Sequence, residues 1–283
     1  MYSRETVAKY YDNFGHGEWG RLDASAHARL MFHLHMHFLQ GFLGPGKSVL
    51  DAGCGAGRFS IQIARAGSEV TLLDISEQQI QLAKQKVQEA GLVVDDARFV
   101  VADICDLSLF QSNTFDVTVC YGGALNYLFD KTSQAIGELM RVTKPGGTIL
   151  ASVMSRWGVF RFTIAYEKLN PREFFSKPDY WLISQVADTG NLTAHPEVNH
   201  PPRHFFTSGE LRSCFQAVGL EKIKLGSAPS ISSQLYSRLD EIEKDATAWE
   251  VFLNLEEKAY CHEGLLDAGE FLLINGRVPR KKH

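Results

Sequence analysis

Clustered cysteines, long apolar runs and extended basic stretches are all missing from this chain of 283 residues. The five cysteines are scattered, odd in number and never spaced as Cys-x-x-Cys, which argues against a disulfide framework and against a zinc site. No segment approaches the roughly 20 apolar residues that span a bilayer, and the N-terminus lacks an apolar signal segment. We therefore expect a cytoplasmic protein without membrane contact and without a bound metal.

Charge and composition narrow the class of protein further. The formal net charge is -4, and the clearest basic run is Arg280, Lys281 and Lys282, so we expect no nucleic-acid partner. Hydrophobic residues make up 45% of the chain and charged residues 22%, which predicts a packed core. The length suits one large α/β domain with insertions, and it carries no signal for the oligomeric state.

Short β-branched runs alternate with helical patterns from Ser48 to Val153, which is typical of parallel strands joined by crossover helices. Strands are predicted at 48–52, 69–73, 97–101, 116–120 and 148–153, and further along at 220–225 and 270–275. The last strand is expected to run antiparallel beside its predecessor. The pattern predicts an α/β fold with a doubly wound, mostly parallel, Rossmann-like sheet.

Helix boundaries are marked by capping and breaking residues. Ser76 with Gln79, and Thr207 with Glu210, have the spacing of capping boxes. Pro145-Gly146-Gly147 follows an apolar helical stripe, so we expect the helix to end there and the fifth strand to begin at Thr148.

A glycine-rich loop follows the first strand, in the sequence Val-Leu-Asp-Ala-Gly-Cys-Gly-Ala-Gly from Val49 to Gly57. Gly53, Gly55 and Gly57 tolerate positive φ, so the loop can turn sharply and point its amides at a ligand. Asp51 precedes the loop, and it suits either a structural role with loop amides or a contact to a bound ammonium group.

Two further acids follow the next two strands. Asp74 ends the second strand, where a carboxylate can accept hydrogen bonds from both hydroxyls of a ribose. Asp103 follows the third strand between Ala102 and Ile104, and a carboxylate between apolar walls suits an adenine. Acids are also common at helix entries and turns, which is the structural alternative for both.

These segments, with Phe115-Asp116-Val117 and Pro145-Gly146-Gly147, resemble the class I S-adenosylmethionine-dependent methyltransferases over roughly residues 45–155. The resemblance implies S-adenosylmethionine as methyl donor, S-adenosylhomocysteine as product, and the strand order 3-2-1-4-5-7-6 with the seventh strand antiparallel. The implied cofactor-binding residues, together with two leader residues that resemble the family's Tyr-rich leader, are Tyr11, Arg21, Asp51, Gly53, Cys54, Gly55, Gly57, Asp74, Ile75, Ala102, Asp103, Ile104, Tyr121 and Gly122.

The chain divides into four expected parts. Residues 1–45 form a helical leader or cap, and residues 46–154 form the cofactor-binding core. Residues 155–206 are too long for a simple connection and are expected to form a lid over the ligand site. Residues 207–283 complete the core, with a helical insertion near 234–260.

The expected acceptor is a small molecule, because the chain after the fourth strand reads Cys-Tyr-Gly-Gly-Ala and lacks the Asn/Asp-Pro-Pro-Tyr motif of amino-methylating nucleic-acid enzymes. Methyl transfer to an oxygen, nitrogen or carbon nucleophile needs a general base only if the nucleophile arrives protonated. His195, His200 and His204 in the insertion are candidates, with His204 preferred. Aromatic residues that would line an acceptor pocket, or else pack as the insertion's own core, are Trp157, Phe160, Phe162, Tyr166, Phe174, Phe175, Tyr180 and Trp181.

Two other functions fit parts of the pattern. An NAD-dependent oxidoreductase also uses a glycine loop with an acid about 20 residues further on, but Arg58 occupies the third glycine position of that fingerprint. A non-catalytic S-adenosylmethionine-binding protein would keep the cofactor residues without the chemistry.

Overall fold

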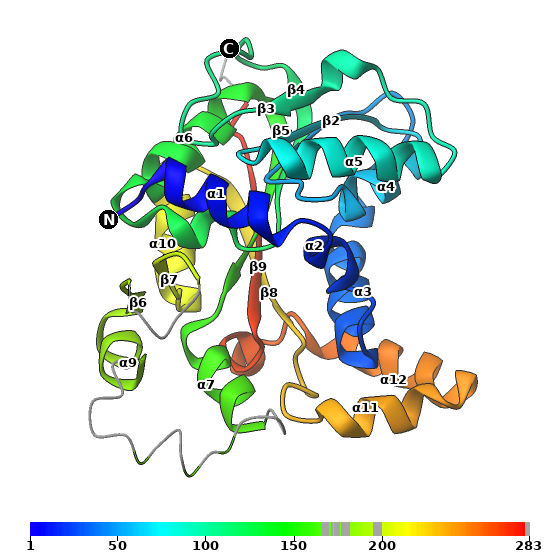
Figure 1. The fold of residues 1–283 in the computed structure, drawn as a ribbon, viewed down its shortest axis with the longest axis vertical. Coiled ribbons are helices and arrows are strands. Elements are labelled where there is room, and N and C mark those ends of the chain that lie inside the picture. The colour runs from blue at the N-terminus through cyan, green and yellow to red at the C-terminus, as the bar shows by residue number, and fades with distance from the viewer. Residues whose placement is uncertain (166–169, 171, 173–175, 177–181, 195–199, 281–283) are drawn as a thin grey trace.

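Seven strands form one sheet in the order β3-β2-β1-β4-β5-β9-β8 in the computed structural model (Figure 1). The structure describes residues 1–280 except 166–169, 171, 173–175, 177–181 and 195–199. The strands are β1 (Ser48–Ala52), β2 (Glu69–Asp74), β3 (Phe99–Val101), β4 (Phe115–Cys120), β5 (Thr143–Met154), β8 (Glu221–Ala228) and β9 (Phe271–Arg277). Strands β1 to β5 pair in parallel, and β9 is antiparallel to both β5 and β8. The predicted fold class and strand order are confirmed.

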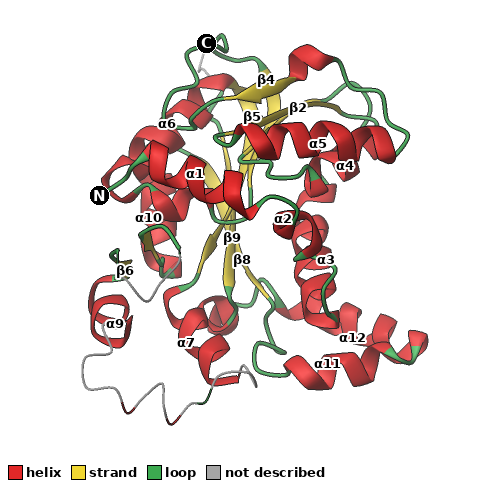
Figure 2. Cartoon of the chain, in the orientation of Figure 1, coloured by secondary structure: helices red, strands yellow, loops and turns green. Residues whose placement is uncertain are grey.

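Helices cover both faces of the sheet, as Figure 2 shows. The α-helices are α1 (Arg4–Phe14), α2 (Gly17–Gly20), α3 (Ala26–Gln40), α4 (Arg58–Arg65), α5 (Glu77–Glu89), α6 (Thr132–Val142), α7 (Arg156–Ala165), α9 (Ala187–Thr189), α10 (Ser208–Ala217), α11 (Tyr236–Glu243) and α12 (Ala246–Ala259). Side chains alternate between the faces, so Val49 packs in the core beneath α3, α4 and α5, while Leu50 packs in the core beneath α6 and α10. Helix α3 of the leader is therefore part of the core layer.

Two strands begin more than one residue from their predicted starts, and β8 and β9 end at Ala228 and Arg277 rather than at residues 225 and 275. Residues 96–98 form a 3-10 turn, so β3 begins at Phe99 rather than at residue 97. Strand β5 begins at Thr143 rather than Thr148, because Thr143 already pairs with Phe115 and a register shift accommodates the Pro-Gly-Gly segment. A Cβ on Gly147 would lie 2.7 Å from the Asp116 carbonyl oxygen, so this close approach of two strands requires glycine.

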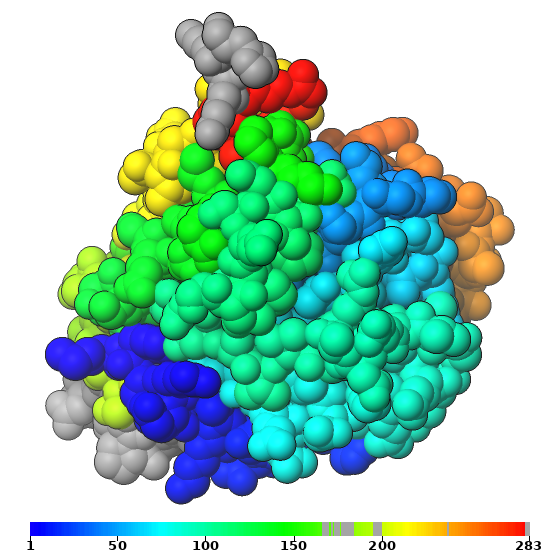
Figure 3. Space-filling view, turned by 90° about the horizontal axis from the view of Figure 1, so that it is seen from above, coloured from blue at the N-terminus to red at the C-terminus, as the bar shows by residue number. Residues whose placement is uncertain are grey.

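One of the two predicted capping boxes is complete. Thr207 accepts from the Glu210 amide while the Glu210 side chain accepts from the Thr207 amide. Ser76 likewise accepts from the Gln79 amide, but the Gln79 side chain does not return to Ser76 and that prediction is wrong. Gln79 Nε2 instead donates to the carbonyls of Tyr11 and Gly15, at 3.1 and 3.0 Å, because α1 packs against α5. Figure 3 shows the N-terminal residues lying on the surface beside α5.

The insertion after β5 contains α7, a π-helical turn at Leu182–Val186, α9 and a small hairpin of β6 (Asn191–Leu192) and β7 (Arg203–His204). Candidate base His195 lies outside the described residues. So do five of the predicted lid aromatics, namely Tyr166, Phe174, Phe175, Tyr180 and Trp181. Across the described part of the chain, no helix is both long and apolar enough to cross a membrane.

Candidate active site

One cavity opens at the carboxyl ends of β1, β2, β3 and β4, the edge where parallel α/β sheets bind ligands. Of the cofactor-binding residues predicted from the sequence, those that line it are Tyr11, Arg21, Gly53, Cys54, Gly55, Asp74, Ile75, Ala102, Asp103, Ile104, Tyr121 and Gly122. Asp51 and Gly57 lie outside its lining. The fold thus brings together four loop segments and a leader that are far apart in the sequence.

The glycine loop forms one wall of the cavity, and its conformation depends on glycine. Gly53, Gly55 and Gly57 have φ of +84°, +51° and +82°, in the left-handed region. A Cβ on Gly53 would lie 3.0 Å from that of Ala124. Gly57 serves a conformational role, since it begins α4 and a Cβ there would lie 3.3 Å from that of Ala83.

Asp51 lies at the end of β1, only 1% exposed, behind the glycine loop. Its Oδ2 accepts a 2.5 Å hydrogen bond from the Ser60 hydroxyl. Burial raises the Asp51 pKa to about 7, and the nearby Asp74 carboxylate adds to the rise. Asp51 therefore supplies negative potential beneath the loop without facing the cavity directly.

Asp74 fastens the glycine loop to the end of β2. Its two carboxylate oxygens accept from the Gly55 amide at 2.8 Å and from the Ser76 amide at 2.9 Å. Burial raises the Asp74 pKa to about 6 even though these amides lower it. The carboxylate also lines the cavity, so it has acceptor capacity left for a ligand hydroxyl.

Leader side chains fill part of the cavity. The Tyr2 hydroxyl donates to Asp103 Oδ2 at 2.6 Å, while the Cys105 amide donates to Oδ1. Arg21 forms a two-point contact with Glu18, with distances of 2.6 and 2.8 Å, across the opening beside the glycine loop. The cavity volume is about 80 Å³ with these side chains in place.

An aromatic cluster lies at the wall formed by the leader and the turn after β4. The hydroxyls of Tyr11 and Tyr127 are 2.8 Å apart. The ring of His200 lies 4.5 Å from that of Tyr10, and its Nε2 is 3.5 Å from the Tyr127 hydroxyl. Burial lowers the His200 pKa to about 4, so its imidazole is neutral at pH 7. His200 thus contacts a cavity residue without lining the cavity.

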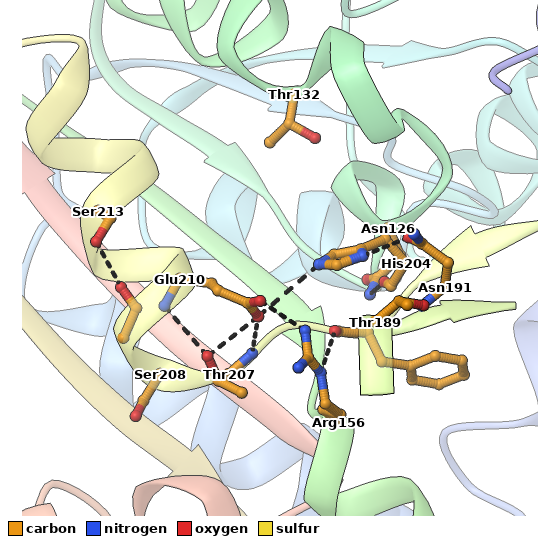
Figure 4. A network of polar contacts seen from close by, with 12 residues as sticks. Asn126, Thr132, Arg156, Thr189, Asn191, His204, Thr207, Ser208, Glu210 and Ser213 are labelled. Atoms are coloured by element: carbon orange, nitrogen blue, oxygen red, sulfur yellow. Dashed lines mark hydrogen bonds and ion pairs between the residues drawn. The ribbon is translucent and has the colours of Figure 1, made fainter. Parts of the chain in front are cut away.

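His204 lies in a separate polar network, drawn in Figure 4. Its Nδ1 lies 2.7 Å from Asn191 Oδ1, and its Nε2 lies 3.9 Å from a carboxylate oxygen of Glu210. Glu210 also pairs with Arg156 at 2.6 Å. Burial lowers the His204 pKa. The network joins the insertion to α10, and His204 does not line the cavity.

Several cavity residues carried no usable sequence signal. Tyr2, Glu18 and Tyr127 line the cavity, but each lies outside the motifs and depends on how the leader folds over the sheet. The Tyr-rich character of the leader is the one cue that pointed in this direction.

The donor set suits an adenosyl ligand better than a metal. Carboxylates of Glu18, Asp74 and Asp103, loop amides and apolar walls are present, whereas the described residues hold no group of three His, Cys, Asp or Glu side chains placed to bind a metal ion. His33 and His37, one helical turn apart on α3, both contact Glu257.

Known proteins resemble this chain over the part that carries the glycine loop. Residues 49–147, from the glycine loop to the Pro-Gly-Gly segment, match the family model "Methyltransferase domain". A malonyl-[acyl-carrier protein] O-methyltransferase of Pectobacterium atrosepticum is 34% identical over 44% of this chain and 46% of its own length. A ubiquinone biosynthesis O-methyltransferase of Bordetella avium is 26% identical over 66% of this chain and 68% of its own length. The similarity thus spans from about half to two thirds of these relatives.

Solved structures agree at the level of the fold. A SAM-dependent methyltransferase from Thermotoga maritima superposes with a TM-score of 0.56 and 17% identity, covering 95% of this chain and 99% of that one. Residues 49–147 thus form a methyltransferase domain, and the chain has the sheet order and fold of the S-adenosylmethionine-dependent methyltransferases.

Proposed function

We propose that this protein transfers a methyl group from S-adenosylmethionine to an oxygen of a small-molecule acceptor. The observation that carries the proposal is the convergence of the glycine loop, Asp74 and Asp103 on one cavity beneath the leader. The choice of oxygen rests on the names of the two relatives, both O-methyltransferases. We further propose a cytoplasmic setting, which the five free cysteines support.

The residues present fit the cofactor by their chemistry. Asp74 would accept from the ribose hydroxyls, and Asp103 from the adenine amine once Tyr2 releases it. Arg21 would meet the carboxylate of the methionine part. When bound, the sulfonium supplies an already activated methyl group, so the chain has to orient the acceptor and exclude water. Residues 46–154 would hold the cofactor, and the leader would border the acceptor.

Binding calorimetry with S-adenosylmethionine, S-adenosylhomocysteine and NAD tests the proposal. We expect both adenosyl ligands to bind and NAD not to bind. Asp74→Ala should weaken binding at least tenfold, because each charge-assisted hydrogen bond contributes about 1.5–3 kcal/mol. Asp95→Ala is the matched control, since Asp95 also accepts the amide two residues further on but lies on the surface.

Methyl transfer itself is measured with labelled S-adenosylmethionine and a panel of hydroxyl-bearing metabolites. Tight binding of NAD without S-adenosylmethionine would contradict the proposal. Binding of the adenosyl ligands with an unchanged affinity in Asp74→Ala would remove Asp74 from the site.

A further inference from the structure

A second cavity adjoins the first at the start of β9. Its volume is about 130 Å³, and its lining is mostly apolar. The two cavities are neighbours, because four residues line both of them: Arg21, Leu22, Phe59 and Gly122. A cavity of about 150 Å³ accommodates benzene, so this one has room for about one six-membered ring.

Two polar side chains face each other in this cavity. His27 lies in the first turn of α3, and Glu270 directly precedes β9. Because β9 is antiparallel, its first residues lie at the same edge where the parallel strand β5 ends, and Phe271 pairs with Met154 (Figure 1). The fold thus places Glu270 at the edge that carries the cofactor cavity. His27 Nε2 lies 2.7 Å from Glu270 Oε1.

These groups have hydrogen-bonding capacity that the described residues leave unused. His27 is 8% exposed, yet neither of its ring nitrogens makes a hydrogen bond of regular geometry. Glu270 Oε1 also lacks such a hydrogen bond. The buried Tyr236 hydroxyl is also without a partner, and its ring lies 4.1 Å from that of His27. Unsatisfied polar groups are costly in a protein interior, so several at one place indicate a bound ligand.

The other histidine of this cavity has a different environment. His35 Nδ1 lies 2.7 Å from the Met31 carbonyl, and its ring packs against Phe59, Tyr121 and Phe271. Its surroundings are those of a core residue.

We propose that this second cavity binds the methyl acceptor, a compound with one compact ring and a hydroxyl group, and that His27 is the catalytic base that takes the hydroxyl proton. The inference rests on the proposed function and assigns its acceptor site. The carboxylate beside Nε2 favours the tautomer with the proton on that nitrogen, which leaves Nδ1 as the acceptor.

The transfer is balanced in atoms and charge. The acceptor oxygen forms a bond to the methyl carbon while the carbon–sulfur bond breaks, and the pair of electrons of that bond stays on sulfur. The hydroxyl proton passes to His27 Nδ1. Glu270 then stabilises the imidazolium, in the same way that an orienting carboxylate supports a histidine base.

Ligand binding tests this assignment without turnover. Phenol and toluene are titrated into the wild-type protein saturated with S-adenosylhomocysteine, and binding is followed by ligand-observed NMR. The two probes have similar shape and differ in the hydroxyl group. We expect phenol to bind about tenfold more tightly than toluene, because only phenol can satisfy a buried polar group.

His27→Phe should remove the preference for phenol and leave the affinity for S-adenosylhomocysteine unchanged. Glu270→Gln keeps the shape of the cavity and should reduce the preference. His33→Phe, on the exposed side of the same helix and also paired with a glutamate, should keep the preference for phenol.

Once the metabolite panel has identified an acceptor, turnover gives a second measurement. With that acceptor, His27→Phe should lower kcat at least a hundredfold.

Two failures are distinguishable. If S-adenosylhomocysteine does not bind the wild-type protein, the proposed function is wrong. If it binds while phenol and toluene show equal affinities, or His27→Phe keeps the preference for phenol, the acceptor site is wrong and the proposed function stands.

Discussion

At the scale of single residues, buried carboxyl groups distinguish this site. Asp51 and Asp74 lie beneath and beside the glycine loop, and burial raises their pKa values to about 7 and about 6. Neither has a cationic partner among the causes of its shift. Such an arrangement costs stability in the free protein, and under the proposed function the two carboxyl groups would gain stability when a ligand carrying positive charge binds nearby.

Asp51→Asn should stabilise the free protein at pH 8 more than at pH 5. The folded pKa of about 7 lies above the unfolded value near 3.9, so the native state holds the proton longer. The contribution of Asp51 to the free energy of unfolding is fully present below the unfolded pKa and is lost as pH rises through the folded pKa. By pH 8 the loss is on the order of 2–4 kcal/mol, and asparagine, which does not ionise, escapes it.

Urea unfolding of both proteins at the two pH values measures this difference. Asp130→Asn, which alters an exposed acid, serves as the control. An equal gain from Asp51→Asn at pH 5 and pH 8 would show that Asp51 is not protonated preferentially in the native state. We also expect Asp51→Asn to weaken binding of S-adenosylmethionine.

At the scale of elements, α1 is held over the cavity at both ends. Tyr2, just before the helix, bonds Asp103, and Gln79 of α5 donates to two carbonyls near the other end. At that same end, Asp12 accepts from the Ser76 hydroxyl at 2.6 Å. The helix therefore contacts the segments that follow β2 and β3, which are the segments that carry the expected cofactor acids.

Gln79→Ala should loosen α1 and speed the release of S-adenosylhomocysteine. The substitution removes two hydrogen bonds from a fully buried side chain, which costs about 1–3 kcal/mol of local stability. Hydrogen exchange of the α1 amides should rise roughly tenfold, measured by mass spectrometry. Gln85→Ala, an exposed glutamine on the same helix, should change neither quantity. Unchanged exchange in Gln79→Ala would mean that other contacts hold α1.

The sequence predicts elements well where local patterns decide them. Strands β1 and β4 and the Thr207 capping box follow from apolar runs and cap residues, and their predictions agree with the structure. The start of β5 at Thr143 and the orientation of Gln79 were missed, because each depends on a neighbour that is distant in the sequence: strand β4 for Thr143 and helix α1 for Gln79. Local propensity does not contain that information.

At the scale of the whole molecule, the two halves of the site differ in how far the sequence reveals them. The cofactor cavity is built from loops that follow consecutive parallel strands, so its residues occur in motifs of regular spacing. The second cavity joins His27 near the N-terminus to Glu270 near the C-terminus, and only the antiparallel return of β9 brings them together. The residues of the first cavity were therefore predictable from the sequence, whereas the meeting of His27 and Glu270 was not.

Ligand binding should stabilise the whole chain. The cofactor cavity is lined by residues of the leader, the glycine loop, the segments after β2 and β3, and the turn after β4, so a ligand there links parts that otherwise open separately. S-adenosylhomocysteine at 100 times its Kd adds about 2.7 kcal/mol to the free energy of unfolding. For a chain of this size that raises Tm by roughly 5–10 °C, measured by calorimetry. NAD at equal concentration should leave Tm unchanged.

Gln79→Ala removes the hydrogen bonds between α5 and α1, so a bound ligand should stabilise α1 less in this variant. With S-adenosylhomocysteine at about 100 times the Kd of each protein, the α1 amides should be less protected from hydrogen exchange in Gln79→Ala than in the wild-type protein. Equal protection would mean that α1 closes on the ligand through its own contacts, and the leader rather than α5 would then determine how tightly the cofactor is held.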